Sequence, residues 1–441
     1  MYLNLMKNNS NNRAITLHIQ NLVNNKKYDE ALNLLNKLAN QNTNQDFNNK
    51  IKGLIYLNQK NWVESISHYS KISKEKVNFE ISNNIGIGLF KLGRLSDASN
   101  KFKETMENKK EYIPAYENFC ITNKLMGNYE ISIKYSLIAL KLMPDNNKII
   151  NNLLDILNYF EPKKNQHIIF NINDQIKEVN LKNNKNKFFN TFEIKKILNK
   201  SDEILKDNNF NNKYPHTQIF KKNSTNLNCE RHLSIFSSHK IIPKFCFGCY
   251  KVQMTVNKVL NLIKLQFYLK KLSLRENNIR KCIVELRENI AGNYKGYVFC
   301  SSIKQAEDIK KIIANDLKGE NIKIDKIEIK HGCSEYYEEF KVYENSEDDV
   351  TNEVYKEEWI EIEKKFDKDN FILENNKERV FDKTLNLFNL PDFLIIKNWL
   401  TYAKILGDDS YKEIFKSEIE INHLSQFEIQ KISKRKKYLL N

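Results

Sequence analysis

Apolar residues three and four positions apart recur through the first 160 residues, with short polar turns between them. The pattern is clear in "NNKKYDEALNLLNKLA", in "IGIGLFKLGRLSDASNKFKE" and in "CITNKLMGNYEISIKYSLIALKLMP". This spacing places the apolar side chains on one face of an α-helix. The first part of the chain is therefore predicted to be all-α, with pairs of helices joined by tight turns.

The helical pattern repeats with a period of 33 or 34 residues, which indicates a stack of equivalent helix pairs. In the second helix of each pair, one position holds a small residue, which lets the paired helices approach closely. The residue four positions later is large and fills the remaining gap. Ser136 departs from this rule, because the other units place a large apolar residue there. The four sets of equivalent slots are Ile19, Lys26, Tyr28, Ala31 and Leu35; Gly53, Lys60, Trp62, Ser65 and Tyr69; Gly86, Gly93, Leu95, Ala98 and Phe102; and Cys120, Gly127, Tyr129, Ser132 and Ser136.

These slots resemble the tetratricopeptide repeat family over residues 12–146, with Pro144 at the end of the last unit and 147–160 as a capping helix. The resemblance implies a helical solenoid with a concave groove. In this family the groove usually binds a peptide or another protein, so a polypeptide partner is expected. The region 12–160 is thus predicted to be a repeat domain.

The residue pattern of the rest of the chain changes twice. Residues 161–228 are polar and Asn-rich, with one helical patch, and are predicted to be a linker. Residues 229–345 are predicted to form an α+β module with an amphipathic helix from Met254, a β-hairpin turning near Gly292, a second helix and a strand. Residues 350–441 return to a helical pattern, and the basic final stretch "KRKKYLLN" is expected to fray. The predicted fold class is multidomain: an all-α solenoid, an α+β module and a helical C-terminal region.

Composition bears on the cellular location of the protein and on the distribution of its charge. The chain has no run of 18 apolar residues and no apolar stretch typical of a secretion signal near Met1, so no membrane span is expected and a cytoplasmic location is predicted. Residues 161–332 hold 33 basic against 17 acidic residues, which equals the whole net charge of +16. A solvated surface is the preferred explanation, because no aromatic residues are interleaved with these charges as in proteins that bind single-stranded nucleic acid.

Three of the seven cysteines and one histidine lie within 21 residues, as Cys229-x2-His232 and, after thirteen residues, Cys246-x2-Cys249. Zinc prefers four thiolate or imidazole ligands in a tetrahedron, and ligand pairs two to four residues apart supply them readily. The sequence therefore predicts a zinc site formed by these four residues. Four protein ligands close the coordination sphere, so the expected role is structural.

Three alternatives to a zinc site remain open for the cysteines. The Cys-x2-Cys pair could be a redox pair at a helix start, as in thioredoxin-like proteins, although no βαβ unit precedes it. An iron–sulfur cluster would need a fourth thiolate from Cys282, Cys300 or Cys333, and no cluster spacing supports it. The thiols could also be ordinary side chains of the fold.

The preferred function is a protein-interaction scaffold or adaptor that uses the repeat groove, with a zinc-stabilised α+β module. The first alternative is an enzyme of unrecognised class, a transferase or a thiol redox enzyme, with the module as its catalytic domain. The second alternative is nucleic-acid binding through the basic middle region. For the enzyme alternative, a group of polar side chains is expected at one end of the sheet: Arg280, Glu285, Arg287, Ser301, Ser302, His331 and Tyr336.

Overall fold

The computed structural model of the chain describes residues 17–19, 21–39, 45–162, 167–182, 188–221, 229–276, 278–287, 290–340, 355–370, 388–415 and 429–435. The chain forms two compact units, one of residues 1–149 and 369–375 and the other of residues 150–368 and 376–441. We refer to them as the repeat unit and the α+β unit. In the described residues most of the regular structure is helical, and five strands form one sheet.

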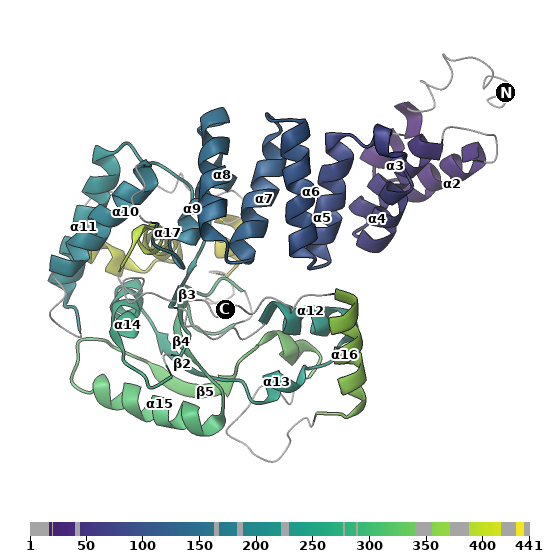
Figure 1. Cartoon of the computed structure of the whole chain (residues 1–441). Coiled ribbons are helices and arrows are strands. Elements are labelled where there is room, and N and C mark those ends of the chain that lie inside the picture. Colours follow the sequence, from purple (N-terminus) through teal and green to yellow (C-terminus); the bar gives the residue numbers. More distant parts are fainter. Residues whose placement is uncertain are drawn as a thin grey trace. The chain divides into compact units, whose positions relative to one another are not determined.

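The repeat unit consists of antiparallel helix pairs that stand side by side (Figure 1). Each pair matches one period of the predicted repeat. A helix follows where one was expected, as α9 (Asn147–Ile156), but from Ile150 on it belongs to the α+β unit. The prediction of a tetratricopeptide-like helical stack is confirmed at the level of the fold. The helices are α2 (Tyr28–Ala39), α3 (Gln45–Asn58), α4 (Trp62–Ser70), α5 (Phe79–Lys91), α6 (Leu95–Asn108), α7 (Ile113–Leu125) and α8 (Tyr129–Leu142), with a 3-10 turn at Lys74–Lys76.

The turn inside each helix pair has the same left-handed backbone. Its equivalent residues are Lys26, Lys60, Gly93 and Gly127, with φ of 60°, 62°, 75° and 77°. Glycine adopts this conformation without steric cost, whereas a side chain brings Cβ against the neighbouring carbonyl. Two of the four turns therefore use the favoured residue, and the two lysines carry local strain.

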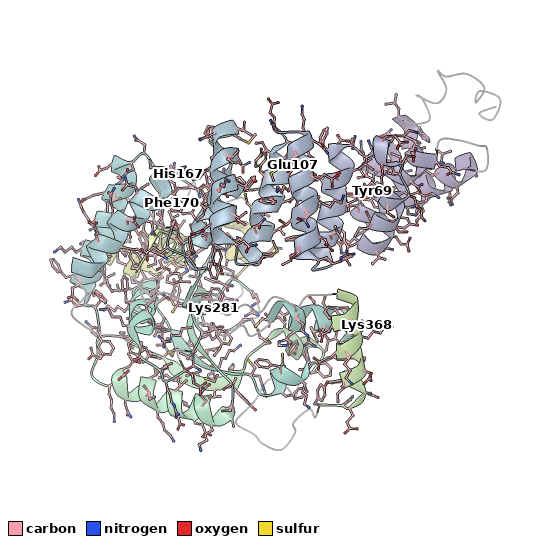
Figure 2. The ribbon with its side chains drawn as sticks, in the orientation of Figure 1. Tyr69, Glu107, His167, Phe170, Lys281 and Lys368 are labelled. Carbon is pink, nitrogen blue, oxygen red and sulfur yellow. The ribbon has the colours of Figure 1, made fainter. Side chains whose placement is uncertain are left out.

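Close packing between the paired helices depends on matched volumes. A Cβ on Gly53 would lie 2.8 Å from the ring of Tyr69, and one on Gly86 would lie 2.6 Å from the ring of Phe102; Tyr69 is marked in Figure 2. In the last repeat Cys120 replaces the glycine, and the fully buried Ser136 replaces the large residue. The departure at Ser136 is thus balanced by the residue it faces.

The α+β unit contains the order strand, helix, two strands, helix, strand. These elements are β2 (Tyr250–Val256), α14 (Val259–Lys271), β3 (Arg280–Val284), β4 (Tyr294–Cys300), α15 (Ile303–Asp316) and β5 (Lys326–His331). The sheet is antiparallel with the order β1-β3-β4-β2-β5, where β1 (Gln218–Lys221) is an added edge strand. The order of the other four strands is that of the ferredoxin-like split βαβ motif.

The two faces of this sheet differ sharply. One face is mostly apolar and includes Val252, Met254 and Val298, and α14 packs on it so closely that a Cβ on Gly296 would lie 2.6 Å from Leu265. Helix α15 packs against β2, β4 and β5. The register places polar side chains on the opposite face, which we call the polar face: Lys251, Gln253, Thr255, Lys281, Lys295, Tyr297, Glu328 and Lys330.

Of two predictions for this unit, one is confirmed and one is wrong. The hairpin is confirmed, because β3 pairs with β4 across the turn near Gly292. The predicted helix start at Met254 is wrong, because Met254, Thr255 and Val256 belong to β2 and α14 begins at Val259. Residues 251–256 alternate polar and apolar side chains as a strand does, but the helical spacing of Val256, Val259 and Ile263 favoured a helix that began too early.

Residues 161–228, expected to be a polar linker, contain α10 (Ile168–Lys182), α11 (Thr191–Asp207) and β1. Apolar side chains hidden among the asparagines, such as Ile172, Ile176 and Ile197, are fully buried and explain why these segments are ordered. The remaining named helices of the unit are α12 (Cys229–His239), α13 (Lys244–Phe247), α16 (Glu358–Asn370) and α17 (Leu390–Leu406), with 3-10 turns at Glu335–Glu338 and Asp409–Glu413.

The C-terminal region is helical where it is described, as expected. The prediction that the last basic stretch frays is wrong at Arg435, which lies in the helix 429–435 and is fully buried. Its guanidinium donates hydrogen bonds to the carbonyls of Arg287, Ile290 and Gly292 and to the side chain of Asn293. The rest of that stretch, 436–441, lies outside the described residues.

The strained turns predict that Lys60→Gly stabilises the protein by about 1 kcal/mol, because glycine removes the left-handed penalty at this turn. Gly127→Ala should destabilise it by about the same amount, since no atom lies within 4 Å of the added Cβ and the cost is confined to the backbone. Urea unfolding of both variants beside wild type measures the two free energies. A destabilised Lys60→Gly variant would contradict the strain argument.

Candidate functional site

Four cysteine thiols gather at one end of the α+β sheet. Cys229 begins α12, Cys246 lies on α13, Cys249 immediately precedes β2, and Cys333 follows β5. We call these residues the thiol cluster. They come from three segments that are distant in sequence, and the pairing of β2 with β5 brings Cys249 and Cys333 to the same end of the sheet.

The thiols influence one another's ionisation. Burial raises the pKa of Cys249 to about 12, and the Cys333 and Cys229 thiols raise it further. Partial burial and the Cys333 thiol raise the pKa of Cys229 to about 11. A hydrogen bond between Cys246 and Cys333 raises the pKa of the Cys246 thiol and lowers that of the Cys333 thiol. Without a cation, the cluster favours neutral thiols at most of its members.

Two neighbours shape the thiol cluster. The hydroxyl of Tyr336 lies 3.2 Å from the Cys246 sulfur and is fully buried. Gly332 lies against Cys249, and a Cβ at this position would be only 2.5 Å from the Cys249 sulfur. Glycine at 332 is therefore needed for the loop after β5 to reach the thiols.

Three of the four predicted zinc ligands belong to the thiol cluster, and the fourth, His232, has its described contacts with other residues. The buried ring of His232 stacks on Phe245, with centroids 5.2 Å apart. Burial lowers its pKa to about 4, and the charge of Arg231 lowers it further, so the imidazole is neutral. Cys333, which the sequence offered only as one of three candidates for a fourth thiolate, is the residue that joins Cys229, Cys246 and Cys249.

Four thiols are a ligand set that suits structural zinc. Within the described residues, however, no three His, Cys, Asp or Glu side chains already have the arrangement of a metal site. The zinc site therefore stays a prediction.

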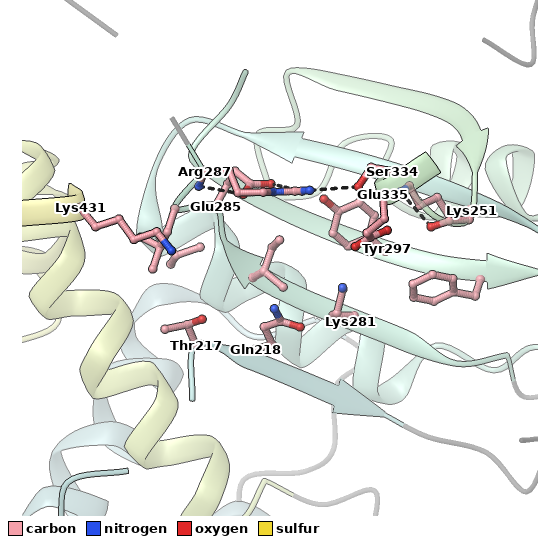
Figure 3. Close-up of a pocket in the computed structure, with 15 residues that line it drawn as sticks. Thr217, Gln218, Lys251, Lys281, Glu285, Arg287, Tyr297, Ser334, Glu335 and Lys431 are labelled. Carbon is pink, nitrogen blue, oxygen red and sulfur yellow. Dashed lines mark hydrogen bonds and ion pairs between the residues drawn. The ribbon is translucent and has the colours of Figure 1, made fainter. Parts of the chain in front are cut away.

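Beside the thiol cluster, the polar face of the sheet borders a cavity of about 350 Å³ (Figure 3). Gly332 and Ser334, on either side of Cys333, line it, so the cavity and the cluster share a wall. Its charged lining consists of four basic and two acidic residues: Lys251, Lys281, Arg287, Lys431, Glu285 and Glu335. Tyr297 and Phe299 supply aromatic surface. We call this cavity the cationic pocket.

Two lysines of the pocket are held on the sheet without an ion pair to any described carboxylate. Lys251 is buried, donates a hydrogen bond of 3.0 Å to the Gly332 carbonyl, and lies over the ring of Tyr297. Burial lowers its pKa to about 8, against the opposing effect of Cys333, and the charge of Lys281 lowers it further. The ammonium group of Lys281 lies over the rings of Phe220, Tyr297 and Phe299, at 5.4, 5.3 and 5.8 Å from their centroids.

The third cation of the pocket floor is already paired. Arg287 forms a two-pronged ion pair with Glu285 and donates a hydrogen bond of 3.0 Å to Ser334 (Figure 3). Glu285 also faces the buried Lys295, at 3.5 Å. Burial alone would raise the pKa of Glu285, but the hydrogen bond from Arg287 and the charges of Lys295 and Arg287 lower it to about 2. Glu285 is therefore ionised at neutral pH and balances the charges of Arg287 and Lys295.

Only some of the seven polar residues expected to gather in an enzyme site lie near one another. Glu285 and Arg287 line the pocket, and Tyr336 contacts the thiol cluster. Arg280 instead points to the apolar side and donates to the Leu269 carbonyl at 2.7 Å. Ser301 and Ser302 cap the start of α15, and His331 stacks on Tyr250. Sequence reasoning missed Lys251, Lys281 and Tyr297, because their common face follows from the strand register.

The Glu285 ion pairs predict a pH-dependent stability effect. At pH 7 Glu285→Gln should destabilise the protein by about 3 kcal/mol, because it leaves the buried Lys295 without its counter-charge. Glu285 has a lowered pKa, so its contribution is complete above pH 4.5 and is lost as the pH falls toward 2. Urea unfolding should show the same gap in free energy between wild type and variant at pH 7 and 5, and a smaller gap at pH 3.5. Glu361→Gln, at an exposed position on α16 where an ion pair contributes little, is the control, and an equal gap at pH 7 and 3.5 would refute the assignment.

Comparison with known proteins adds little to this picture. No protein-family model and no curated protein sequence matches the chain. Among solved structures, a double mutant of MamA RS-1 is 18% identical, with 33% of this chain and 82% of that chain covered and a TM-score of 0.31. The C-terminal part of a TPR repeat-containing protein from Cytophaga hutchinsonii is 16% identical, with 44% and 80% covered and a TM-score of 0.34. Likeness at this level carries no argument about function, and the helical-repeat architecture rests on the geometry above. No helix among the described residues is long and apolar enough to cross a membrane.

Proposed function

We propose that the chain is a protein-interaction adaptor whose repeat unit binds a polypeptide partner. The observation that carries the proposal is an apolar stripe left uncovered on the last repeat. Ile131, Ile138 and Leu142 of α8 are 43%, 36% and 47% exposed. Their spacing of seven and four residues places them on one face of the helix. We call them the α8 stripe, and Met143, also 47% exposed, extends it.

The architecture of the repeat unit suits this role. Matched pairs such as Gly53 with Tyr69 and Gly86 with Phe102 fix each helix against the next, so the surface is preorganised. A preorganised surface loses little conformational entropy on binding. Contiguous exposed apolar residues on an otherwise polar protein commonly mark an interaction site. The resemblance to tetratricopeptide repeats supports the same class of partner.

The α8 stripe can be tested with the full chain as bait. The Ile131→Asp/Leu142→Asp double variant should lose at least tenfold in recovery of any partner that wild type retains, because a buried charge replaces two apolar contacts. Lys141→Asp, an exposed change on the same helix, should keep the partner. Quantitative mass spectrometry after affinity purification measures the three recoveries. Equal recovery with the double variant, or no partner with wild type, would contradict the proposal.

We also propose that the thiol cluster holds one structural zinc ion, with Cys333 in the place that the sequence pattern gave to His232. A set of four thiols fits the preference of zinc for sulfur ligands. Binding would replace the protons that the cluster keeps in the absence of a cation, and its free energy would add to the stability of the α+β unit. The ligands would join α12, α13 and the segment after β5 into one end of the unit.

Elemental analysis tests the zinc proposal directly. Wild type purified without chelator should contain about one zinc per chain, and Cys333→Ser and Cys246→Ser/Cys249→Ser should lose it. His232→Asn should keep the metal, because its ring lies against Phe245 and outside the cluster. Loss of zinc in His232→Asn with retention in Cys333→Ser would restore the ligand set predicted from the sequence. Iron and sulfide in the sample would indicate a cluster instead.

The thiol redox alternative makes a different prediction for the same samples. A redox pair would give metal-free protein in which Cys246 and Cys249 form a disulfide that dithiothreitol reduces reversibly. Alkylation of native protein followed by mass spectrometry distinguishes this outcome, because zinc-bound thiolates are protected until a chelator is added. A reversible disulfide without metal would replace the zinc proposal with the redox one.

A further inference from the structure

The cationic pocket combines features that a plain sheet surface does not have. An antiparallel sheet usually exposes a polar face to water. Here the polar face is largely buried: Lys251 and Gln253 are each 7% exposed, Tyr297 is 5% exposed and Lys295 is 2% exposed. Buried charges are costly unless they are paired. A face that buries several cations around a cavity therefore suggests a binding role for an oppositely charged group.

The charges of the pocket do not cancel. Its lining carries four cations and two carboxylates. Glu285 is committed to Arg287 and Lys295. Lys281 forms no hydrogen bond or ion pair with any described residue, and its ammonium group is held by three aromatic rings. Lys251 has only a carbonyl as its described acceptor, and its charge and that of Lys281 repel each other. Glu335 attracts Lys281 and Lys251 through its charge, but among the described residues it forms an ion pair with neither. With both carboxylates counted against the four cations, the described lining keeps two positive charges in excess.

The size and lining of the cavity limit the ligand. A volume of about 350 Å³ falls at the lower end of the range for small-molecule sites. Aromatic rings of Tyr297 and Phe299 on the floor can contact an organic body, while Ser334 and Arg287 supply hydrogen-bond donors at the rim. Figure 3 shows Lys281 and Lys251 on the strands and Lys431 reaching over from the helix 429–435.

We propose that the cationic pocket binds a small organic molecule through a dianionic phosphate group, placed between Lys251 and Lys281. Two uncompensated ammonium groups match the two charges of a phosphate better than the single charge of a carboxylate. Phosphate oxygens also accept hydrogen bonds from several donors at once, which suits a site with two lysines, an arginine and a hydroxyl. This binding role is independent of the partner surface on α8.

Isothermal titration calorimetry with pyrophosphate, at constant ionic strength and with the full chain, tests the proposal. Wild type should bind pyrophosphate, and Lys281→Met should weaken binding at least tenfold. The control is Lys330→Met, since Lys330 lies on the same polar face but outside the cavity and contacts Glu328. Acetate, measured as a competitor of pyrophosphate at the same concentration, should bind at least tenfold more weakly than pyrophosphate. Absence of pyrophosphate binding, equal binding by Lys281→Met, or equal competition by acetate would overturn the proposal.

A second measurement separates ligand binding from a structural role of the lysine. If Lys281 serves a ligand, Lys281→Met without ligand should unfold at the same or a higher urea concentration, because the change removes an uncompensated, partly buried charge. A large loss of stability would assign Lys281 to the fold instead. A single-stranded oligonucleotide that binds wild type and Lys281→Met equally, while pyrophosphate fails to bind, would indicate a nucleic-acid surface rather than a small-molecule pocket.

Discussion

The α+β unit depends on the pairing of β2 with β4 on one side and β5 on the other. This central strand sends Val252 and Met254 into the core under α14 and sends Lys251 and Gln253 to the polar face. It also begins directly after Cys249, so its register decides which residues meet that thiol. A slip of one residue would exchange the two faces and bury the lysines in the core. The apolar core, the thiol cluster and the cationic pocket are thus consequences of one pairing.

The repeat unit solves a different packing problem by local rules. Each helix pair meets its neighbour through a small residue and a large one, and the last repeat keeps the total volume with Cys120 and Ser136. Since contacts lie within about 35 residues of sequence, the repeats can be recognised from spacing alone. Serine at the small slot adds a hydrogen bond, as Ser65 does to the Gly53 carbonyl and Ser132 to that of Cys120, both at 2.8 Å.

The same contrast explains what the sequence could predict. The helices of the repeats and the hairpin around Gly292 follow from local periodicity and were predicted correctly. The strand β2 was missed although its residues alternate, because the helical spacing of the apolar residues that follow was extended back across it. Cys333 lies 84 residues after Cys249, and only the pairing of β5 with β2 brings it to the cluster. Lys251 and Lys281 likewise share a face through strand register, which residue spacing does not encode.

Arg435 links the helix 429–435 to the edge of the cationic pocket. Its guanidinium donates hydrogen bonds to the carbonyls of Arg287, Ile290 and Gly292, and Arg287 lines the pocket. Those carbonyls would be left without these donors in a chain that stops short of residue 429. A change at Arg435 would therefore alter the edge of the cationic pocket without touching a side chain that lines it.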